Sequence, residues 1–359
     1  MKIAIILGTR PEIIKLSPII RECERRKLDY CIIHTGQHYS YAMDRIFFDE
    51  LQLPLPGHHL DVGSGSHGRQ TGTMLAGLED LLAQEAPGLV YVQGDTNTVL
   101  AGALAAAKLH IPVGHVEAGL RSFDRAMPEE VNRVLTDHVA DLLFAPTGAS
   151  RELLLKEGIP ASRVFVTGNT IVDAVRENLQ LADGRVLRQL GLAPRSYLLS
   201  TLHRQENVDS RDRLAEIVHG LDLVCREWGL PVVLPVHPRT RKMMEAFGLA
   251  LPEGIRLVEP VGFLEFLAAE AGARLVLTDS GGVQEESCIL GVPCVTLREN
   301  TERPETVAAG ANVLAGHRPG DILAAARKMM AAEGRWQNPF GDGTAGRQII
   351  DRSLGALPG

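Results

Sequence analysis

Short apolar runs alternate with longer amphipathic segments along almost the whole chain. Runs such as Ile3-Ala4-Ile5-Ile6-Leu7 have the length of a buried strand, and the segments between such runs have the apolar spacing of helices. This alternation is typical of βα units, whose strands form a parallel sheet. The sequence therefore predicts an α/β fold.

Two series of strands are predicted. The first comprises residues 2–7, 30–34, 88–93, 112–116, 141–145 and 163–167. The second comprises residues 196–201, 231–235, 255–258, 273–278, 293–297 and 311–315. The polar stretch between the two series contains a predicted hinge at 170–185. We therefore expect an N-terminal Rossmann-like domain of residues 1–172, a C-terminal one of residues 173–343, and a last helix within 344–359.

Length and charge limit the class of protein. With 359 residues, 45% of them hydrophobic, the chain exceeds what one core usually organises. A net charge of -7 and an aromatic content of 4% provide neither a broad basic face nor many base-stacking platforms, so we expect no nucleic acid partner. An anionic ligand would have to be bound by local cations and helix N-termini.

The five cysteines are odd in number and form no CxxC pair, so we interpret them as reduced core residues. The chain opens directly into a predicted strand without a signal pattern, and no apolar run reaches membrane-spanning length. We therefore expect a cytoplasmic protein without a membrane partner.

Polar segments follow several predicted strands. In open α/β sheets, ligands bind outside the carboxyl ends of the strands. The segments in question are Gly8-Thr9-Arg10-Pro11-Glu12, Gly94-Asp95-Thr96-Asn97, Glu117-Ala118-Gly119-Leu120-Arg121, Leu202-His203-Arg204-Gln205-Glu206-Asn207 and Asp279-Ser280-Gly281-Gly282.

The segment after the strand 273–278 indicates a phosphate site. Gly281 and Gly282 allow a diphosphate to approach the backbone closely, and Ser280 can cap the helix or donate a hydrogen bond. Glu286 follows within the same predicted helix and could accept hydrogen bonds from ribose hydroxyls. The alternative for Glu286 is a solvated charge near a helix start.

Cations and carboxylates follow the strands of the first series. Arg10 and Lys15 could meet a phosphate, or could be solvated charges of a plain strand-to-helix turn. Asp95, Glu117 and Glu129 could serve as acid and base at a sugar carbon. For each acid the alternative is an ion pair with Arg121 or Arg133. In the second series, His203 could neutralise phosphate or move a proton.

Other motifs do not support a cofactor. Gly63-Ser64-Gly65-Ser66-His67-Gly68 matches G-x-G-x-x-G, but it follows no convincing strand and is not at the first βα turn. The sequence has no P-loop, no G-x-S-x-G and no H-E-x-x-H, and the pair His58-His59 lacks helical ligand spacing. We expect neither NAD nor a metal, and no other cofactor.

Six motifs, taken together and in order, resemble those of the non-hydrolysing UDP-N-acetylglucosamine 2-epimerases. The resemblance runs from residue 1 to beyond 310. The motifs are Gly8-Thr9-Arg10-Pro11-Glu12, Gln93-Gly94-Asp95-Thr96, Val116-Glu117-Ala118-Gly119-Leu120-Arg121, Pro128-Glu129-Glu130-Val131-Asn132-Arg133, Thr278-Asp279-Ser280-Gly281-Gly282 and Thr301-Glu302-Arg303-Pro304-Glu305.

The resemblance implies two Rossmann-like domains of the GT-B type with the active site in an interdomain cleft, and a last helix that crosses back to the first domain. It also implies interconversion of UDP-N-acetylglucosamine (UDP-GlcNAc) and UDP-N-acetylmannosamine (UDP-ManNAc) without NAD. Anti elimination of UDP gives 2-acetamidoglucal, and UDP then re-adds. We expect a homodimer.

The resemblance assigns roles by position. It implies that Arg10, Lys15, His203 and Arg303 lie at the diphosphate and the reacting sugar. Asp95, Glu117 and Glu129 match the acid-base candidates of the family. The UDP contacts correspond to Ser280, Gly281, Gly282 and Glu286, with Phe266 packing the uracil and Val261 contributing backbone.

The chain departs from many bacterial members at Thr35-Gly36-Gln37-His38-Tyr39-Ser40-Tyr41, where they carry a Gln-His-Arg stretch that helps hold an activating UDP-GlcNAc. The departure puts activation by substrate in question. Three further functions are compatible with the same residues: a GT-B glycosyltransferase, a hydrolysing epimerase that releases ManNAc, and a catalytically silent nucleotide-sugar sensor.

Overall fold

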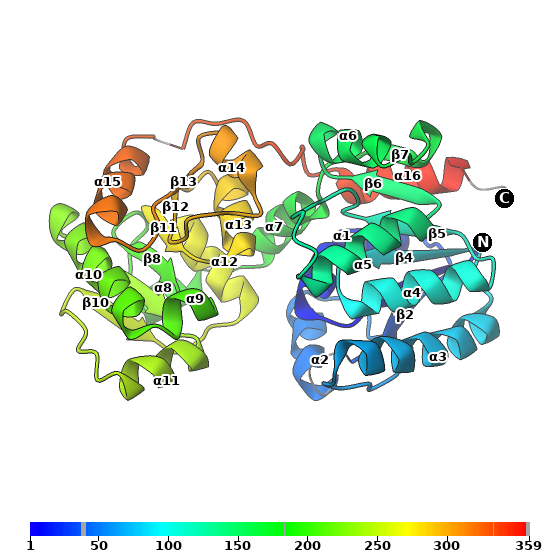
Figure 1. The fold of residues 1–359 in the computed structure, drawn as a ribbon, viewed down its shortest axis with the longest axis horizontal. Coiled ribbons are helices and arrows are strands. Elements are labelled where there is room, and N and C mark those ends of the chain that lie inside the picture. The colour runs from blue at the N-terminus through cyan, green and yellow to red at the C-terminus, as the bar shows by residue number, and fades with distance from the viewer. Residues whose placement is uncertain (37–40, 183, 333, 357–359) are drawn as a thin grey trace. The chain divides into compact units, whose positions relative to one another are not determined.

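The computed structural model describes residues 1–36, 41–182, 184–332 and 334–356. The chain forms two compact units, Met1–Arg176 with Phe340–Gly359, and Glu177–Pro339, each built on its own sheet (Figure 1). Residues 37–40 of the segment that departs from the bacterial pattern lie outside the described residues.

The first unit contains a seven-stranded sheet, and all of its described strand pairs are parallel. In spatial order the strands are β3 (His58–His59), β2 (Tyr30–His34), β1 (Ile3–Leu7), β4 (Leu89–Gln93), β5 (Val113–Val116), β6 (Leu142–Ala145) and β7 (Val164–Val166). This is the Rossmann order with one strand added at the edge. The six predicted strands are confirmed. The two-residue β3 was not predicted because His58-His59 has no apolar alternation.

Helices cover both faces of this sheet. They are α1 (Arg10–Arg26), α2 (Tyr41–Glu50), α3 (His67–Glu85), α4 (Asn97–Lys108), α5 (Pro128–Val139), α6 (Gly148–Lys156), α7 (Thr170–Leu181) and α16 (Ala345–Ala356), with a short 3-10 helix at Ala161–Arg163. Figure 1 shows α3, α4 and α5 side by side, and Val90 and Val92 of β4 share a core cluster with residues of α3 and α4. Between them, Tyr91 points to the other face, where its hydroxyl donates to Ser353 of α16 at 2.6 Å.

The C-terminal helix α16 packs on α1 at the start of the chain. Its N-terminus is capped by Asp173, whose carboxylate accepts from the backbone N–H groups of Ala345 at 3.2 Å and Gly346 at 2.9 Å. Gly346 permits the close approach, because a Cβ there would lie 2.9 Å from Cβ of Pro18. The helix expected within 344–359 corresponds in position to α16, Ala345–Ala356.

The second unit contains a six-stranded sheet whose described pairs are also parallel. Its strands, in spatial order, are β10 (Ile255–Val258), β9 (Val232–Pro235), β8 (Leu198–Thr201), β11 (Leu275–Thr278), β12 (Cys294–Thr296) and β13 (Asn312–Leu314). These six strands were all predicted, so the α/β class with parallel sheets is confirmed.

Two core clusters lie on opposite faces of the second sheet. Leu198 of β8 packs in a cluster with residues of α10 and α15, whereas the next residue, Leu199, packs in a cluster with Val283 of α13. The helices of this unit are α8 (Arg185–Gln189), α9 (Gln205–Val208), α10 (Arg211–Trp228), α11 (Pro238–Ala246), α12 (Phe263–Gly272), α13 (Gly281–Leu290), α14 (Pro304–Ala308) and α15 (Pro319–Met330).

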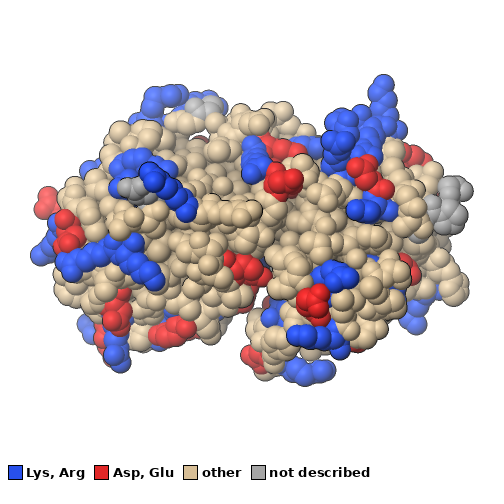
Figure 2. Space-filling view, turned by 90° about the horizontal axis from the view of Figure 1, so that it is seen from above, with Lys and Arg blue, Asp and Glu red and all other residues tan. Residues whose placement is uncertain are grey.

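The surface carries charge of both signs. On the face shown in Figure 2, basic and acidic side chains form small separate groups among uncharged residues. All five cysteines are free, and four of them are buried, as the sequence predicted for reduced core residues. Among the described residues, no helix is both long enough and apolar enough to cross a membrane.

Candidate active site

Each sheet has one point where the strand order reverses direction, and polar loops follow the two strands on either side of it. In the first unit these strands are β1 and β4, and in the second they are β8 and β11. In open α/β sheets this is the place where ligands bind. The loops concerned contain Arg10, Asp95, His203 and Ser280, which the sequence had singled out.

The turn after β1 is closely packed against its neighbours. A Cβ on Gly8 would lie 2.0 Å from Oγ1 of Thr35 and 2.5 Å from Oγ1 of Thr98, so only glycine fits. Arg10 begins α1 at the surface, with its guanidinium carbon 4.9 Å from the centre of the Phe47 ring.

Glu12 joins this turn to the loop after β4. Its carboxylate accepts from the backbone N–H groups of Gly8 at 2.6 Å and Thr9 at 2.9 Å, and it also accepts from the hydroxyl of Thr96. Burial raises the pKa of Glu12 to about 7, although these hydrogen bonds oppose the shift. Sequence reasoning missed this role, for which a capping-box spacing from Thr9 to Glu12 was the available signal.

Glu117 follows β5 and is 6% exposed. Nζ of Lys15 lies 2.7 Å from both of its carboxylate oxygens, the amide of Gln93 donates to it, and Nδ2 of Asn169 lies 3.3 Å from Oε1. Its backbone is in the left-handed region, with φ of 69°, which costs a non-glycine residue on the order of 1 kcal/mol. The residues around it therefore fix the position of this carboxylate.

Asp95 pairs with Arg133 of α5, and Nδ2 of Asn132 donates to the backbone carbonyl of Asp95 at 2.9 Å. The Asp95 side chain keeps 34% of its surface exposed, so a ligand can reach it. The ion pair with Arg133, which was the alternative prediction for the acids, is present at Asp95.

The two neighbouring acids of α5 differ in their environment. Glu130 is buried and accepts from the backbone N–H groups of Ser122 at 2.8 Å and Phe123 at 3.0 Å, with NH1 of Arg133 at 3.1 Å. Burial opposes its ionisation, but the hydrogen bonds from Ser122 and Phe123 and the charge of Arg133 lower its pKa below the ordinary value. Glu129 is exposed on the first turn of the helix.

A buried network supports the loops after β4 and β5. Nδ1 of His115 lies 2.6 Å from Asp137, and its Nε2 lies 2.8 Å from the backbone carbonyl of Gly94, next to Asp95. Asp137 also pairs with Arg121 at 2.7 Å. Arg121 therefore pairs with a different acid from the ones considered from sequence, and the network holds the segments that contain Asp95 and Glu117.

In the second unit, Ser280 is the N-cap of α13, and its Oγ accepts from the backbone N–H of Val283 at 3.5 Å. Gly281 is buried, whereas Gly282 is exposed, and a Cβ on Gly282 would lie 3.9 Å from Oγ of Ser280. The backbone N–H groups of this turn and the positive end of the helix dipole favour an anion here. Glu286 is half-buried further along the same helix.

His203 is held by the buried Asp279 at the end of β11. The backbone N–H groups of His203 and Arg204 donate to the Asp279 carboxylate at 3.1 and 3.0 Å, and Nδ1 of His203 lies 3.0 Å from Oδ1. Burial opposes ionisation of Asp279, but these contacts lower its pKa below the ordinary value. Asp279 was noted only as part of a motif, and its role in positioning the His203 loop was missed.

A surface pocket next to His203 includes a second histidine. Its lining residues are His203, Arg204, Gln205, Glu206, His237 and Arg239. The rings of His203 and His237 are 6.1 Å apart, and burial together with His203 lowers the pKa of His237. His237 was not predicted. The available signal was its position between the end of β9 and Pro238 at the start of α11, because functional side chains often lie in the loops that follow parallel strands.

Arg303 and Phe266 lie in separate parts of this unit. Nε of Arg303 is 2.8 Å from Glu285 of α13, so the arginine contacts the helix that begins at Ser280. Phe266, on the first turns of α12, packs against the core cluster that contains Val283, and Val261 is half-buried just before that helix.

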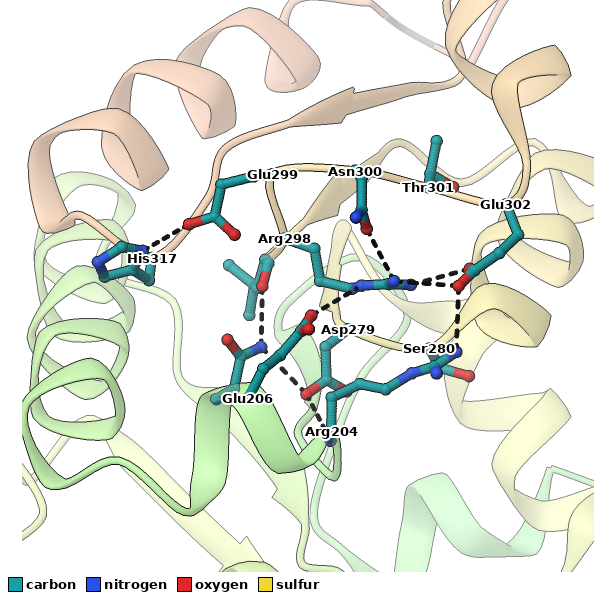
Figure 3. A network of polar contacts seen from close by, with 12 residues as sticks. Arg204, Glu206, Asp279, Ser280, Arg298, Glu299, Asn300, Thr301, Glu302 and His317 are labelled. Atoms are coloured by element: carbon teal, nitrogen blue, oxygen red, sulfur yellow. Dashed lines mark hydrogen bonds and ion pairs between the residues drawn. The ribbon is translucent and has the colours of Figure 1, made fainter. Parts of the chain in front are cut away.

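Arg298, which sequence reasoning missed, lies at the centre of the polar network in Figure 3. It is 5% exposed and contacts Glu206 at 3.1 Å, Asn300 at 2.8 Å and Glu302 at 2.9 Å. The network connects the loop after β8 with the loop after β12. No local motif marks it, because Glu206 and Arg298 are 92 residues apart.

Two Rossmann-like sheets, each with polar loops at its reversal point, define an α/β protein of the class built from two Rossmann-like units. The sequence model of the UDP-N-acetylglucosamine 2-epimerase family matches residues 21–353. The chain therefore belongs to this family.

Relatives match over almost the whole length. A UDP-N-acetylglucosamine 2-epimerase of Methanocaldococcus jannaschii is 54% identical over 358 residues, which are 98% of each chain. The crystal structure of the M. jannaschii UDP-GlcNAc 2-epimerase in complex with UDP-GlcNAc and UDP matches with a TM-score of 0.88 at 54% identity, over 99% of this chain and 100% of that chain. A UDP-2,3-diacetamido-2,3-dideoxy-D-glucuronate 2-epimerase of Pseudomonas aeruginosa is 44% identical over 359 residues, covering 98% of this chain and 99% of the relative.

Proposed function

We propose that the protein is an isomerase that interconverts UDP-GlcNAc and UDP-ManNAc by epimerisation at C2. The environment of Glu117 is the structural observation that supports this most. It is an almost fully buried carboxylate at a strand end, held in a left-handed backbone conformation by partners from three other segments. The relative of known structure at 54% identity, crystallised with UDP-GlcNAc and UDP, supports the choice of substrate.

The second unit binds UDP in this proposal. The N-terminus of α13, with Ser280, Gly281 and Gly282, receives the diphosphate, because its N–H groups and dipole stabilise negative charge. Arg303, which contacts α13 through Glu285, adds positive charge, and His203 is a further contact for the diphosphate. Glu286 binds the ribose hydroxyls, and Phe266 with Val261 receives the uracil.

The reaction is an elimination followed by a re-addition. A carboxylate removes the proton from C2 while the bond between C1 and the diphosphate oxygen breaks on the opposite face, giving 2-acetamidoglucal and UDP. UDP then re-adds at C1, and C2 receives a proton on its other face, so that the overall composition is unchanged. Stabilising the departing diphosphate is therefore as important as moving the proton.

Groups of the first unit transfer the protons and assist the leaving group. Asp95 and Glu117 are our first candidates, because each lies at a strand end and is paired with a cation that a ligand could draw away. Glu129, exposed at the start of α5, is the third candidate. Arg10 and Lys15 assist departure of the diphosphate.

The P. aeruginosa relative favours a second candidate substrate. That protein is named for a 2-epimerisation of a diacetamido uronate linked to UDP, and it is 44% identical to this chain. Its reaction would use the same elimination, but on a sugar that carries an additional acetamido group and a carboxylate. A comparison of kcat/KM for the two substrates distinguishes the two assignments, and we expect UDP-GlcNAc to be preferred.

The purified protein should be incubated with UDP-GlcNAc alone in D2O and followed by proton NMR. We expect UDP-ManNAc to form without an acceptor, with deuterium entering at C2 of both sugars. Release of free ManNAc and UDP would instead indicate a hydrolysing epimerase. Tight binding with neither turnover nor exchange would indicate a sensor, and a requirement for an acceptor would indicate a glycosyltransferase.

We also propose that the protein acts in the cytoplasm as a homodimer. Light scattering coupled to size-exclusion chromatography measures the assembly. A mass equal to that of one chain at micromolar concentration would contradict the dimer.

A further inference from the structure

Glu302 places a negative charge beside the proposed diphosphate site. If Gly281 had a Cβ, that atom would lie 3.5 Å from Oε2 of Glu302, so the carboxylate is adjacent to the first residue of α13. An anion at a helix N-terminus is stabilised by the dipole, and a second anion at the same terminus is repelled by the first. A diphosphate could bind there only if the charge of Glu302 were compensated.

Arg298 provides this compensation. Its NH1 and NH2 groups lie 2.9 and 3.0 Å from the two carboxylate oxygens of Glu302, which is the two-point geometry that guanidinium groups form with carboxylates. Burial opposes ionisation of Glu302, but its contacts with Arg298 bring its pKa to about 2. Glu302 is therefore ionised at neutral pH, and its charge is paired.

The guanidinium of Arg298 is fixed from other sides as well. Its Nε lies 3.1 Å from Glu206 of α9, and its NH2 lies 2.8 Å from Oδ1 of Asn300. Arg204 approaches Glu302 with NH2 at 3.9 Å, on the side of Ser280 in Figure 3. Arg298 and Arg204 thus offset the charges of Glu206 and Glu302, and loss of Arg298 would leave an excess of negative charge next to Gly281.

We propose that Arg298 is a positioning residue for the reaction, which neutralises and orients Glu302 so that the N-terminus of α13 can accept the diphosphate of a nucleotide. Arg298 makes its contacts with protein groups, and its effect on the ligand passes through Glu302. The inference rests on the proposed function in one respect, namely that a diphosphate binds at Ser280, Gly281 and Gly282.

A double-mutant cycle on the full-length chain tests this step. The dissociation constant of UDP is measured by calorimetry for the wild type, Arg298→Gln, Glu302→Gln and the double variant. We expect Arg298→Gln to weaken UDP binding about ten- to hundredfold, because it exposes a like charge near the diphosphate. In the Glu302→Gln background the same arginine change should weaken binding by less than about threefold. An arginine effect of equal size in both backgrounds would overturn the inference.

Uridine separates the electrostatic role from a structural one. It lacks the diphosphate, so its affinity, measured by competition, should change less than about twofold in Arg298→Gln. A parallel loss of uridine and UDP binding would show that the arginine merely supports the fold. Arg298→Lys should restore part of the affinity for UDP, since it keeps the charge but loses the two-point contact.

Glu302→Gln alone keeps the inference testable if Arg298→Gln does not fold. Removing the acid while Arg298 remains should tighten UDP binding by about threefold, and weaker binding would contradict the proposal. The wild type could bind UDP, and the variants could follow the predicted cycle, while the wild type fails to convert UDP-GlcNAc. This result would contradict the proposed function and leave this inference standing.

Discussion

The ammonium group of Lys15 lies 2.7 Å from both carboxylate oxygens of Glu117, although the two residues are 102 positions apart in the chain. The pair connects the first helix of the first unit to the end of β5. Lys15 was expected at a phosphate, and in the structure its ammonium group contacts this carboxylate. In the reaction that we propose, Lys15 leaves Glu117 for the departing diphosphate as the carboxylate takes up a proton.

Replacement of Glu117 by glutamine should abolish most of the turnover without unfolding the protein. The amide keeps the size of the side chain but cannot accept a proton, so kcat should fall by about a hundredfold or more. The melting temperature should change by only a few degrees. Asp351→Asn is the control, because it also removes an acid paired with a cation, in this case Arg26, but lies on α16. A loss of stability that matches the loss of rate would assign Glu117 a structural role.

Replacement of Gly8 by alanine tests how closely the turn after β1 is packed. A methyl group there would lie 2.0 Å from Oγ1 of Thr35, so Gly8→Ala should displace the turn and lower the free energy of unfolding by about 2 kcal/mol. Gly72→Ala in α3 is the matched control, since nothing lies within 4 Å of its added methyl group and alanine favours a helix. Urea unfolding of both variants gives the comparison. Equal stability of the two would show that the turn can relax.

The fold was largely predictable from the sequence because its signals are local. Most strands are visible as short apolar runs, such as Ile3–Leu7 and Leu89–Gln93, and the turn chemistry at Thr9-Arg10-Pro11 and Ser280-Gly281-Gly282 marks helix starts directly. The strand β3 was missed because two residues are too few to show an alternation of apolar and polar positions.

The candidate site was predictable only in part. Residues that follow strands could be named, because parallel strands end at the same edge of a sheet. Asp279 and Arg298 could not be recognised as organisers of these loops, since their roles arise from hydrogen bonds to residues 70 or more positions away. For Glu12 only the local capping-box contacts had a sequence signal, and its bond from Thr96 did not. The sequence also gave no reason to distinguish the buried Glu130 from the exposed Glu129.

Glu12 should make stability depend on pH in the range below neutrality. Its pKa is raised from 4.5 to about 7 on folding, so the folded protein binds this proton more tightly than the unfolded chain. The resulting stabilisation is complete below pH 4.5 and is lost as the pH rises through 7. Glutamine can keep the capping contacts without titrating.

The free energy of unfolding of wild type should therefore decrease relative to that of Glu12→Gln between pH 4.5 and 8. The expected difference is about 3 kcal/mol, from 1.36 kcal/mol for each unit of pKa shift. Urea titrations at several pH values measure it. If the free energy of unfolding depended on pH in the same way for wild type and Glu12→Gln, Glu12 would not be the group that binds this proton.

Asp279 should show the opposite dependence on pH. Its carboxylate accepts from the backbone N–H groups of His203 and Arg204, and Asp279→Asn would replace one acceptor oxygen by an NH2 group that faces these donors. A buried donor without an acceptor is costly, so the variant should lose about 2 to 3 kcal/mol of unfolding free energy.

Because folding lowers the pKa of Asp279, its ionised form stabilises the protein above the ordinary value of 3.8, and this contribution is lost as the pH falls through the lower folded value. The advantage of wild type over Asp279→Asn should consequently be largest at neutral pH and shrink below pH 4. The variant should also reduce kcat/KM for UDP-GlcNAc more than His203→Gln does, since it displaces the whole loop rather than one ring. A smaller effect than that of His203→Gln, or a stability difference that does not change with pH, would show that Asp279 does not hold the loop through its charge.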